Sequence, residues 1–210
     1  MTSRSSIKAH VTHARILEAA RRELGRDPDS SLGDIAEAAG VARHTIYGHF
    51  AGRAAVVDDL VADAGEAVRR ASAAVARAPT QDPVTALARF VLTLWPVGDR
   101  YRTLITLAHR DLGPDRVGRL LGPARDTVAG ILTRGRHQGV FHTVVPPYPL
   151  GRALEAHLLA LLDSVDSGLW TDDGTAAATA ALITAGVSSD LATATVQHLR
   201  VDTGQPQSSR

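Results

Sequence analysis

Apolar residues recur every three to four positions along most of the chain, the spacing that places them on one face of an α-helix. Breaks rich in Gly and Pro divide this pattern into segments of helical length, and no segment has a convincing strand pattern. The sequence therefore predicts an all-α fold. The expected helices are 12–24, two short helices within 32–50, 53–77, 83–95, 100–112, 123–138, 150–170, and one broken or two short helices over 175–185 and 188–200. Residues 1–10 are expected to form a mobile arm, and the polar C-terminal residues a frayed tail.

Residues 31–40 have the features of a short amphipathic helix followed by a sharp turn. Its apolar positions follow the i, i+3, i+4, i+7 spacing: Leu32, Ile35, Ala36 and Ala39. Ser31 can cap the N-terminus, and Asp34 three residues later completes a variant of the capping box. Gly40 stands where helices often end on a left-handed residue.

A second short helix follows this turn. Val41 is expected to fill the corner, while Ile46 and Phe50 turn toward the interior. The side chains left on the outer face can all hydrogen-bond to phosphates or base edges, and none is acidic: Arg43, His44, Thr45, Tyr47 and His49. This pattern is typical of a helix-turn-helix whose second helix reads a DNA groove.

The order Ile-Ala-x-x-Ala-Gly-Val, then Thr-Ile-Tyr-x-His-Phe, then a basic residue resembles the TetR family of transcriptional regulators. The matching residues are Ile35, Ala36, Ala39, Gly40, Val41, Thr45, Ile46, Tyr47, His49, Phe50 and Arg53. The resemblance covers about residues 11–60, and only general helical character extends beyond it. The chain departs from the family at Ala42, where Ser or Thr is usual, and at Gly48, where a bulky or basic residue is common.

The resemblance implies a three-helix DNA-binding domain and a larger helical domain for ligand binding and dimerisation. We predict that the first domain, with its flexible arm, spans residues 1–52, the second 53–205, and the tail 206–210. Arg43, His44 and Thr45 are expected to lie nearest the base edges or flanking phosphates. The remaining predicted DNA contacts go to the backbone or, from the arm, to a neighbouring groove: Tyr47, His49, Arg53 and Lys8.

The distribution of charge supports this prediction better than the net charge of +1 does. Residues 1–22 contain five basic residues and one acidic residue, and residues 41–53 contain Arg43 and Arg53 with no acid. A local basic surface of this kind is typical of nucleic-acid binding. The chain has no cysteine, which excludes disulfides, thiolate zinc sites and cysteine nucleophiles. With no signal-peptide pattern and no long apolar run, we expect a soluble cytoplasmic protein that does not interact with membranes.

Other candidate chemistry is weak. His10 and His13 share a helical face, but they lack a third ligand, so no metal site and no cofactor are predicted. His109-Arg110-Asp111 matches part of a kinase catalytic loop without the rest of that motif, and no Gly-x-Ser-x-Gly elbow occurs. We therefore do not expect an enzyme.

The second half of the chain is expected to bind a small apolar or aromatic molecule. By resemblance, the predicted pocket residues are Phe90, Leu94, Trp95, Leu104, Leu107 and His109, although each by itself is more often a core residue than a ligand contact. Apolar stripes on the helices from Leu150 and Thr175 fit either a dimerising bundle or an intramolecular core. Dimerisation is favoured because one helix-turn-helix reads too few base pairs.

The resulting hypothesis is a homodimeric repressor that binds a palindromic operator in double-stranded DNA and is released by a small effector. An activator of the same family and a small-molecule binding protein with a non-functional helix-turn-helix remain alternatives. The missing cap at Ala42 is the feature that favours the second alternative.

Overall fold

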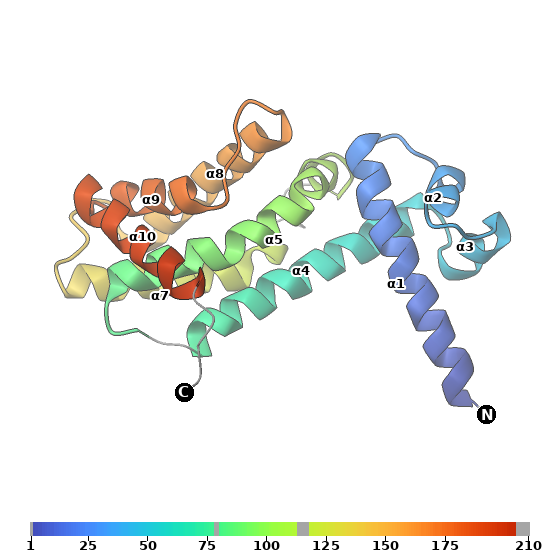
Figure 1. Ribbon diagram of the computed structural model, residues 1–210, viewed down its shortest axis with the longest axis horizontal. Helices are drawn as coiled ribbons and strands as arrows, with labels where there is room; N and C mark the ends of the chain where they lie inside the picture. The colour runs from blue at the N-terminus through green and yellow to red at the C-terminus, as the bar shows by residue number, and fades with distance from the viewer. Residues whose placement is uncertain (1, 78–79, 113–117, 205–210) are drawn as a thin grey trace. The chain divides into compact units, whose positions relative to one another are not determined.

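The computed structural model describes the backbone of residues 2–77, 80–112 and 118–204, and side chains from 7 to 201 except 78–79, 105–106 and 108–117. No strand occurs in these ranges, and the predicted all-α fold is confirmed (Figure 1). The helices are α1 (Thr2–Arg26), α2 (Leu32–Ala38), α3 (Arg43–His49), α4 (Arg53–Arg77), α5 (Pro83–Leu112), α7 (Gly122–His137), α8 (Pro147–Asp166), α9 (Thr175–Thr184) and α10 (Ser189–Gly204).

Contacts divide the chain into two compact units. Unit 1 comprises residues 1–66 and 103–120, and unit 2 comprises residues 67–102 and 121–210. Both α4 and α5 therefore contribute residues to both units. The predicted boundary between residues 52 and 53 stays a prediction, and the predicted tail at 206–210 lies outside the described residues.

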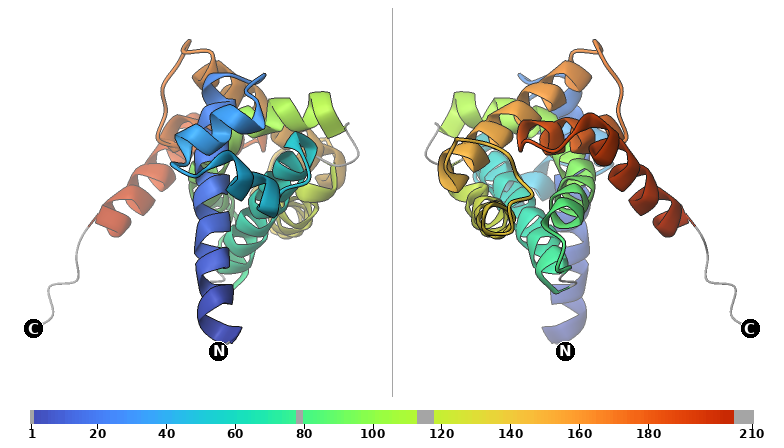
Figure 2. Two further views of the ribbon diagram at one scale, coloured as in Figure 1. Left: turned by 90° about the vertical axis from the view of Figure 1, so that its right-hand side faces the viewer. Right: turned by 90° about the vertical axis from the view of Figure 1, so that its left-hand side faces the viewer.

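In unit 1, α2 and α3 lie beside the C-terminal half of α1, as Figures 1 and 2 show. The apolar faces predicted for α1, α2 and α3 meet in one core with the first turns of α4. They do so because the apolar stripe of a helix is buried only by packing against another element. The most buried side chains of this core are Ile16, Ala20, Leu24, Ile35, Ala36, Ile46, Phe50, Val56, Val57 and Leu60.

In unit 2, α7 packs against α8 and α9 packs against α10. The face that α9 buries is formed mostly by alanine, which allows close approach of its neighbours: Ala177, Ala178, Ala181 and Leu182 are fully buried. The indole Nε1 of Trp95 donates to the carbonyl oxygen of Asp172 at 3.1 Å. The guanidinium of Arg125 on α7 forms an ion pair with the carboxylate of Glu155 on α8, with Nη2 and Oε1 2.7 Å apart.

The residues of the two apolar stripes considered for a dimer interface differ in how deeply they are buried. Five members are buried within the single chain, as the intramolecular alternative requires: Leu162, Ala177, Ala181, Leu182 and Val196. Leu158, Leu161 and Val165 on α8 remain half-buried.

Three predicted boundaries are wrong. The chain is helical from Thr2, so residues 2–10 continue α1 instead of forming an arm. The predicted helices 83–95 and 100–112 are one helix, α5, which continues through Pro96. Pro96 is exposed while Trp95 and Tyr101 are buried, so burial on the other face of the helix offsets the lost backbone hydrogen bond. Asp99 therefore lies inside α5, where its carboxylate pairs with Arg102.

The third difference concerns α8, which spans Pro147–Asp166 where the sequence predicted 150–170. Its prolines occupy the first turn, where a missing N–H costs nothing and φ is already helical. The helix ends early because Gly168 adopts φ +72°. The backbone N–H of Gly168 then bonds to Val165 and that of Leu169 to Ser164, which is the Schellman pattern.

None of the helices in the described part of the chain has the length and hydropathy needed to cross a bilayer.

Two glycines of α7 give a test of this packing. A Cβ at Gly135 would lie 2.1 Å from Cδ2 of Phe141, whereas one at Gly130 would meet only Nη1 of Arg134, at 3.9 Å. We expect Gly135→Ala to lower the free energy of unfolding by about 1–3 kcal/mol through overpacking. Gly130→Ala should raise it by about 0.5–1 kcal/mol, because alanine favours the helix. Urea denaturation measures both, and equal effects of the two variants would contradict the described Phe141 contact.

Candidate nucleic-acid interface

The N-terminus of α2 is held by the capping box predicted from the sequence. Ser31 Oγ accepts from the backbone N–H of Asp34 at 3.3 Å, and the Ser31 N–H donates to Oδ2 of Asp34 at 2.8 Å. The bonds donated by the Ser31 side chain and backbone, together with the charge of Arg43, hold the pKa of Asp34 below its usual value. These bonds fix where α2 begins.

The turn after α2 is fixed by Gly40, at φ +62°. The N–H of Gly40 donates to the carbonyl of Glu37 and that of Val41 to the carbonyl of Ala36, both at 2.9 Å. This is a Schellman motif, so the predicted left-handed glycine is confirmed. Ala42 follows in an extended conformation at the N-cap of α3 and makes no side-chain cap bond, as its sequence implies.

The seven residues of α3 have one inward and one outward side. Ile46 and Phe50 are buried, as predicted from their spacing. Arg43 and His44 are exposed, Tyr47 is 60% exposed, and Thr45 is half-buried. The helix therefore presents three of the five predicted contact residues fully to the outside. Arg43 lies against α2, since a Cβ at Gly33 would be 3.4 Å from its Cζ.

His49 differs from the other predicted contact residues because it belongs to a ring cluster. Its imidazole lies 5.9 Å from that of His13, which stacks on Phe50 with a centroid distance of 4.8 Å. Nε2 of His13 also lies 3.2 Å from Oδ2 of Asp59 on α4. The cluster connects α1, α3 and α4, so His49 is half-buried.

Sequence analysis did not predict that His13 belongs to this cluster. It considered His13 only with His10, as a weak candidate for a metal site. The actual partners of His13 are 36 to 46 residues away, so spacing along the chain carries no signal for them. Within the described ranges, no group of three His, Cys, Asp or Glu side chains could hold a metal ion.

Arg53 begins α4 and has a structural contact. Its Nη2 donates to the carbonyl oxygen of Pro28 at 2.5 Å, which ties the start of α4 to the loop before α2. A phosphate contact by Arg53 stays a prediction; the residue as a whole is half-buried, and its Nε is buried.

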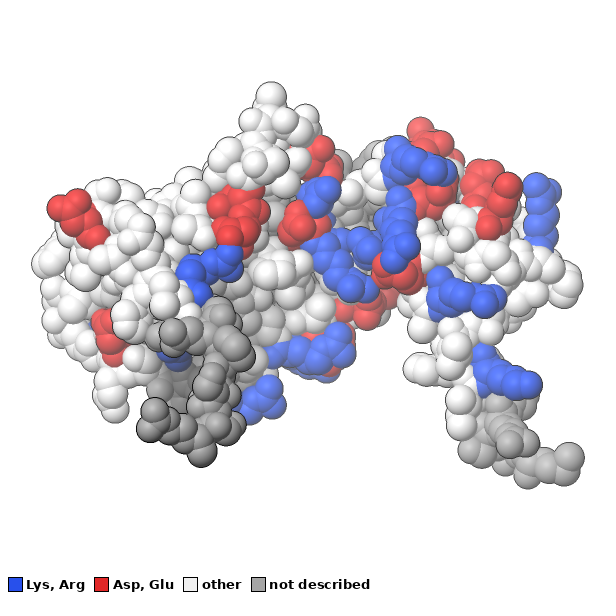
Figure 3. All heavy atoms as spheres, viewed as in Figure 1, with Lys and Arg blue, Asp and Glu red and all other residues white. Residues whose placement is uncertain are grey.

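Basic side chains are spaced along α1 on the face drawn in Figure 3. Lys8 and Arg15 are exposed, whereas Arg21 and Arg22 both pair with Glu18, at 2.8 and 2.9 Å. The positive charge of this helix is therefore concentrated at Lys8 and Arg15, because Glu18 neutralises part of the charge of Arg21 and Arg22. Lys8 lies on the helix and not on an arm.

The predicted pocket residues are divided between the two units. Phe90 and Trp95 are buried and Leu94 half-buried in unit 2, whereas Leu104 and Leu107 are buried in unit 1. The side chain of His109 lies outside the described residues. A ligand site formed by these six residues stays a prediction.

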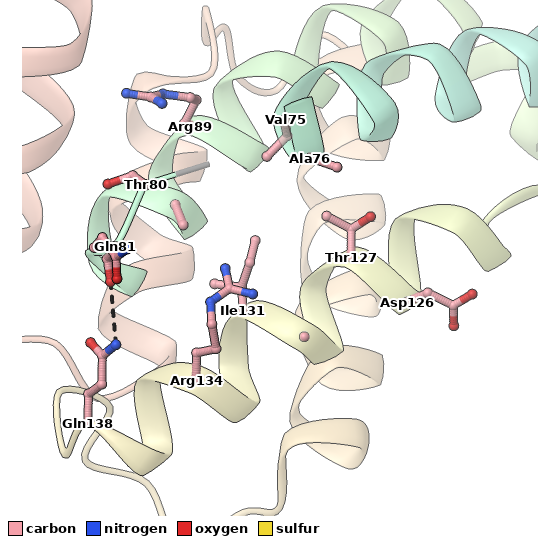
Figure 4. A pocket seen from close by; sticks show the side chains of 12 residues that line it. Val75, Ala76, Thr80, Gln81, Arg89, Asp126, Thr127, Ile131, Arg134 and Gln138 are labelled. Atoms are coloured by element: carbon pink, nitrogen blue, oxygen red, sulfur yellow. Dashed lines mark hydrogen bonds between the residues drawn. The ribbon is translucent and has the colours of Figure 1, made fainter. Parts of the chain in front are cut away.

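The structure describes a different cavity in unit 2, of about 520 Å³, between the end of α4, the start of α5 and α7 (Figure 4). Its lining residues are Val75, Ala76, Thr80, Gln81, Ala86, Arg89, Asp126, Thr127, Gly130, Ile131, Arg134 and Gln138. None of them was predicted, because a cavity depends on how three helices meet and each helix by itself has an ordinary amphipathic pattern.

Comparison with known proteins identifies the N-terminal domain. Residues 16–60 match the family model described as bacterial regulatory proteins, tetR family. No curated protein sequence matches the chain.

Solved structures share the fold of the chain. The TetR family transcriptional regulator PfmR from Thermus thermophilus is similar with a TM-score of 0.67 and 20% identity, over 82% of this chain and 98% of that one. The TetR-like regulator LfrR from Mycobacterium smegmatis, in complex with proflavine, gives a TM-score of 0.63 and 24% identity, over 81% and 93%. RolR in complex with resorcinol gives a TM-score of 0.56 and 20% identity, over 97% of this chain and 98% of that one.

The uncapped start of α3 gives a test of this interface. We expect Ala42→Ser to raise the free energy of unfolding by about 0.5–1 kcal/mol, because the hydroxyl can accept from a free N–H of the first turn. Ala51→Ser, at an exposed bend after α3, is the matched control and should be nearly neutral. Thermal and urea denaturation measure both. Equal effects of the two variants would show that α3 is capped in another way.

Proposed function

We propose that this chain, which carries the N-terminal domain of the TetR family of bacterial regulatory proteins, is a transcriptional repressor that binds a palindromic operator as a homodimer and is released by a small molecule. The observation that carries the proposal is the outer face of α3, where Arg43, His44 and Tyr47 are exposed beside an intact capping box and Schellman turn. The chain is then a regulator and not an enzyme, and it works in the cytoplasm, where the DNA is.

The contacts with DNA divide into two kinds. Arg43, His44 and Thr45 occupy the first turn of α3 and reach base edges or flanking phosphates, while Tyr47 donates to the backbone. Arg43 exchanges its position beside Asp34 for a position beside a phosphate or a guanine. His49, at the last residue of α3, stays near His13 and reaches the backbone from the edge of the ring cluster.

Lys8 and Arg53 add sequence-independent contacts. Lys8 is exposed on α1, and Arg53 begins α4 beside the loop that contains Pro28. Each phosphate contact contributes to affinity through counterion release and carries no sequence information.

Two copies are needed because a single seven-residue helix reads too few base pairs for an operator. In a two-fold dimer, equivalent helices reach half-sites about 34–36 Å apart along the DNA. We assign the contact between copies to α8, whose Leu158, Leu161 and Val165 are half-buried in the single chain. The buried stripe of α9 is unavailable for it.

Release follows from a shift between two conformations. Both α4 and α5 contribute residues to unit 1 and unit 2, so a ligand bound in unit 2 can favour one arrangement of these helices. A coupling of about 1–3 kcal/mol changes DNA affinity roughly 5–150-fold.

A small-molecule binding protein with a non-functional helix-turn-helix is the second candidate, favoured only by the uncapped Ala42. The retained capping box at Ser31 and the left-handed Gly40 weigh against it, because neither is needed for binding a ligand in unit 2.

The proposal is tested by mobility shift with a duplex that the protein selects from a random library, and with DNA upstream of its own gene. We expect a retarded complex whose affinity falls steeply with salt. A protein that retards no duplex in a salt-dependent manner would exclude the repressor and favour the second candidate.

The assigned roles are separated by single substitutions. Arg53→Ala should weaken binding to the selected duplex and to random DNA by the same factor, and should reduce the salt slope of dimer binding by about 2, which is about 1 per copy. Arg77→Ala, the same charge change at the end of α4, is the control and should leave both affinities unchanged. Because Arg53 also bonds to Pro28, the melting temperature is measured in parallel. A loss confined to the selected duplex would overturn the phosphate role.

A further inference from the structure

We propose that the cavity between α4, α5 and α7 binds an amphipathic monoanion, a molecule with a carboxylate at one end and an apolar body, and that Arg134 holds the carboxylate. This inference rests on the proposed function, because it names the chemical class of the effector. The proposed site is separate from the predicted set around Trp95, which stays a prediction.

The size and walls of the cavity suit a small organic molecule. Its volume of about 520 Å³ lies within the range of about 300–1,000 Å³ typical of small-molecule sites. Val75 and Ala76 from α4, Ala86 from α5 and Ile131 from α7 provide apolar walls on three sides. Ala86 and Ile131 are buried, so packing fixes their two walls, whereas Val75 is half-buried and Ala76 is exposed.

Arg134 is the charged side chain that faces this space. Figure 4 shows it rising from α7 toward Val75 and Ala76, while Arg89 and Asp126 point away. Its Nη1 lies 3.9 Å from the position that a Cβ at Gly130 would occupy, so the side chain extends back along α7 over a residue without a side chain. Gly130 therefore keeps open the space in front of the guanidinium.

The polar groups around Arg134 have other partners. Nε2 of Gln138 donates to the carbonyl oxygen of Gln81 at 3.4 Å, and the hydroxyl of Thr127 donates to that of Pro123 at 2.9 Å. Asp126 is eight residues away on the same helix, which is about 12 Å along the axis. Within the described part of the chain, the guanidinium of Arg134 has no hydrogen-bond or ion-pair partner.

The chemistry of the ligand follows from this arrangement. A guanidinium pairs with a carboxylate through two parallel hydrogen bonds, a geometry that an amide or an alcohol cannot match. The apolar walls then cover the remainder of the molecule. Arg134 is itself solvent-exposed, so a neutral ligand would leave its charge to water alone, whereas a cation would be repelled.

The test is isothermal titration of the full chain with three probes of equal length: 4-phenylbutyrate, 4-phenylbutanamide and 4-phenylbutylamine. We expect the acid to bind roughly tenfold or more tightly than the amide, and the amine most weakly. Arg134→Gln should remove the preference for the acid. Arg136→Gln, an exposed arginine on the same helix outside the cavity lining, should keep it.

A second variant guards against an indirect effect of Arg134. Gly130→Leu fills the space in front of the guanidinium with a helix-forming residue, and it should weaken binding of all three probes without lowering the melting temperature. Equal binding of acid and amide, an unchanged acid affinity in Arg134→Gln, or no binding of any probe at millimolar concentration would overturn the proposal.

Failure of this site and failure of the proposed function are distinguishable by mobility shift with and without the acid. A DNA complex that forms while the acid does not bind leaves the repressor intact and removes the site. If the acid binds to a protein that retards no DNA, the site stands and the repressor function is excluded.

Discussion

The burial of Ile46 and Phe50 determines which side chains of α3 face outward. A helix of seven residues with no side-chain cap is too short to be stable alone, since isolated helices below about 12–15 residues are marginal in water. Its orientation therefore depends on contacts with the rest of unit 1. Each of these two buried side chains contributes about 1.5–3 kcal/mol. The exposed position of Tyr47, which lies between them in the chain, follows from this burial, and His44 is exposed on the same outer side.

Two further contacts hold this arrangement from opposite ends. The Schellman turn at Gly40 sets the angle between α2 and α3, and the ring cluster of His13, His49 and Phe50 fixes the end of α3 against α1. The bond from Arg53 to Pro28 then places the start of α4. A reading surface held in this way is organised before DNA binds, so little binding energy is spent on ordering it.

The sequence predicts those features that depend on residues close to one another in the chain. Three such features are confirmed: the capping box at Ser31, the left-handed Gly40 and the burial of Ile46. Each depends only on residues within about four positions in the chain. The pairing of His13 with Asp59 and the position of Arg43 beside Asp34 join different helices, so neither was predicted.

The errors in unit 2 have the same origin. Pro96 ends a helix by local rules, yet burial of Trp95 and Tyr101 on either side keeps α5 continuous. The cavity could not be predicted because it is the space left where three helices meet. Arg134, exposed like Arg136 on the same helix, carries no sequence signal that sets it apart. The proposed site at Arg134 adds one negative charge to the apolar or aromatic ligand expected from the sequence.

The central claim is that two copies of this chain read DNA through α3 from the two halves of one site. Hydroxyl-radical footprinting on a selected duplex, combined with the mass of the complex by sedimentation, tests it most directly. We expect two chains per duplex and two protected blocks whose centres are about 10–10.5 base pairs apart, or a multiple of that spacing. A single chain with one protected block, or protection that is uniform along the duplex, would contradict it.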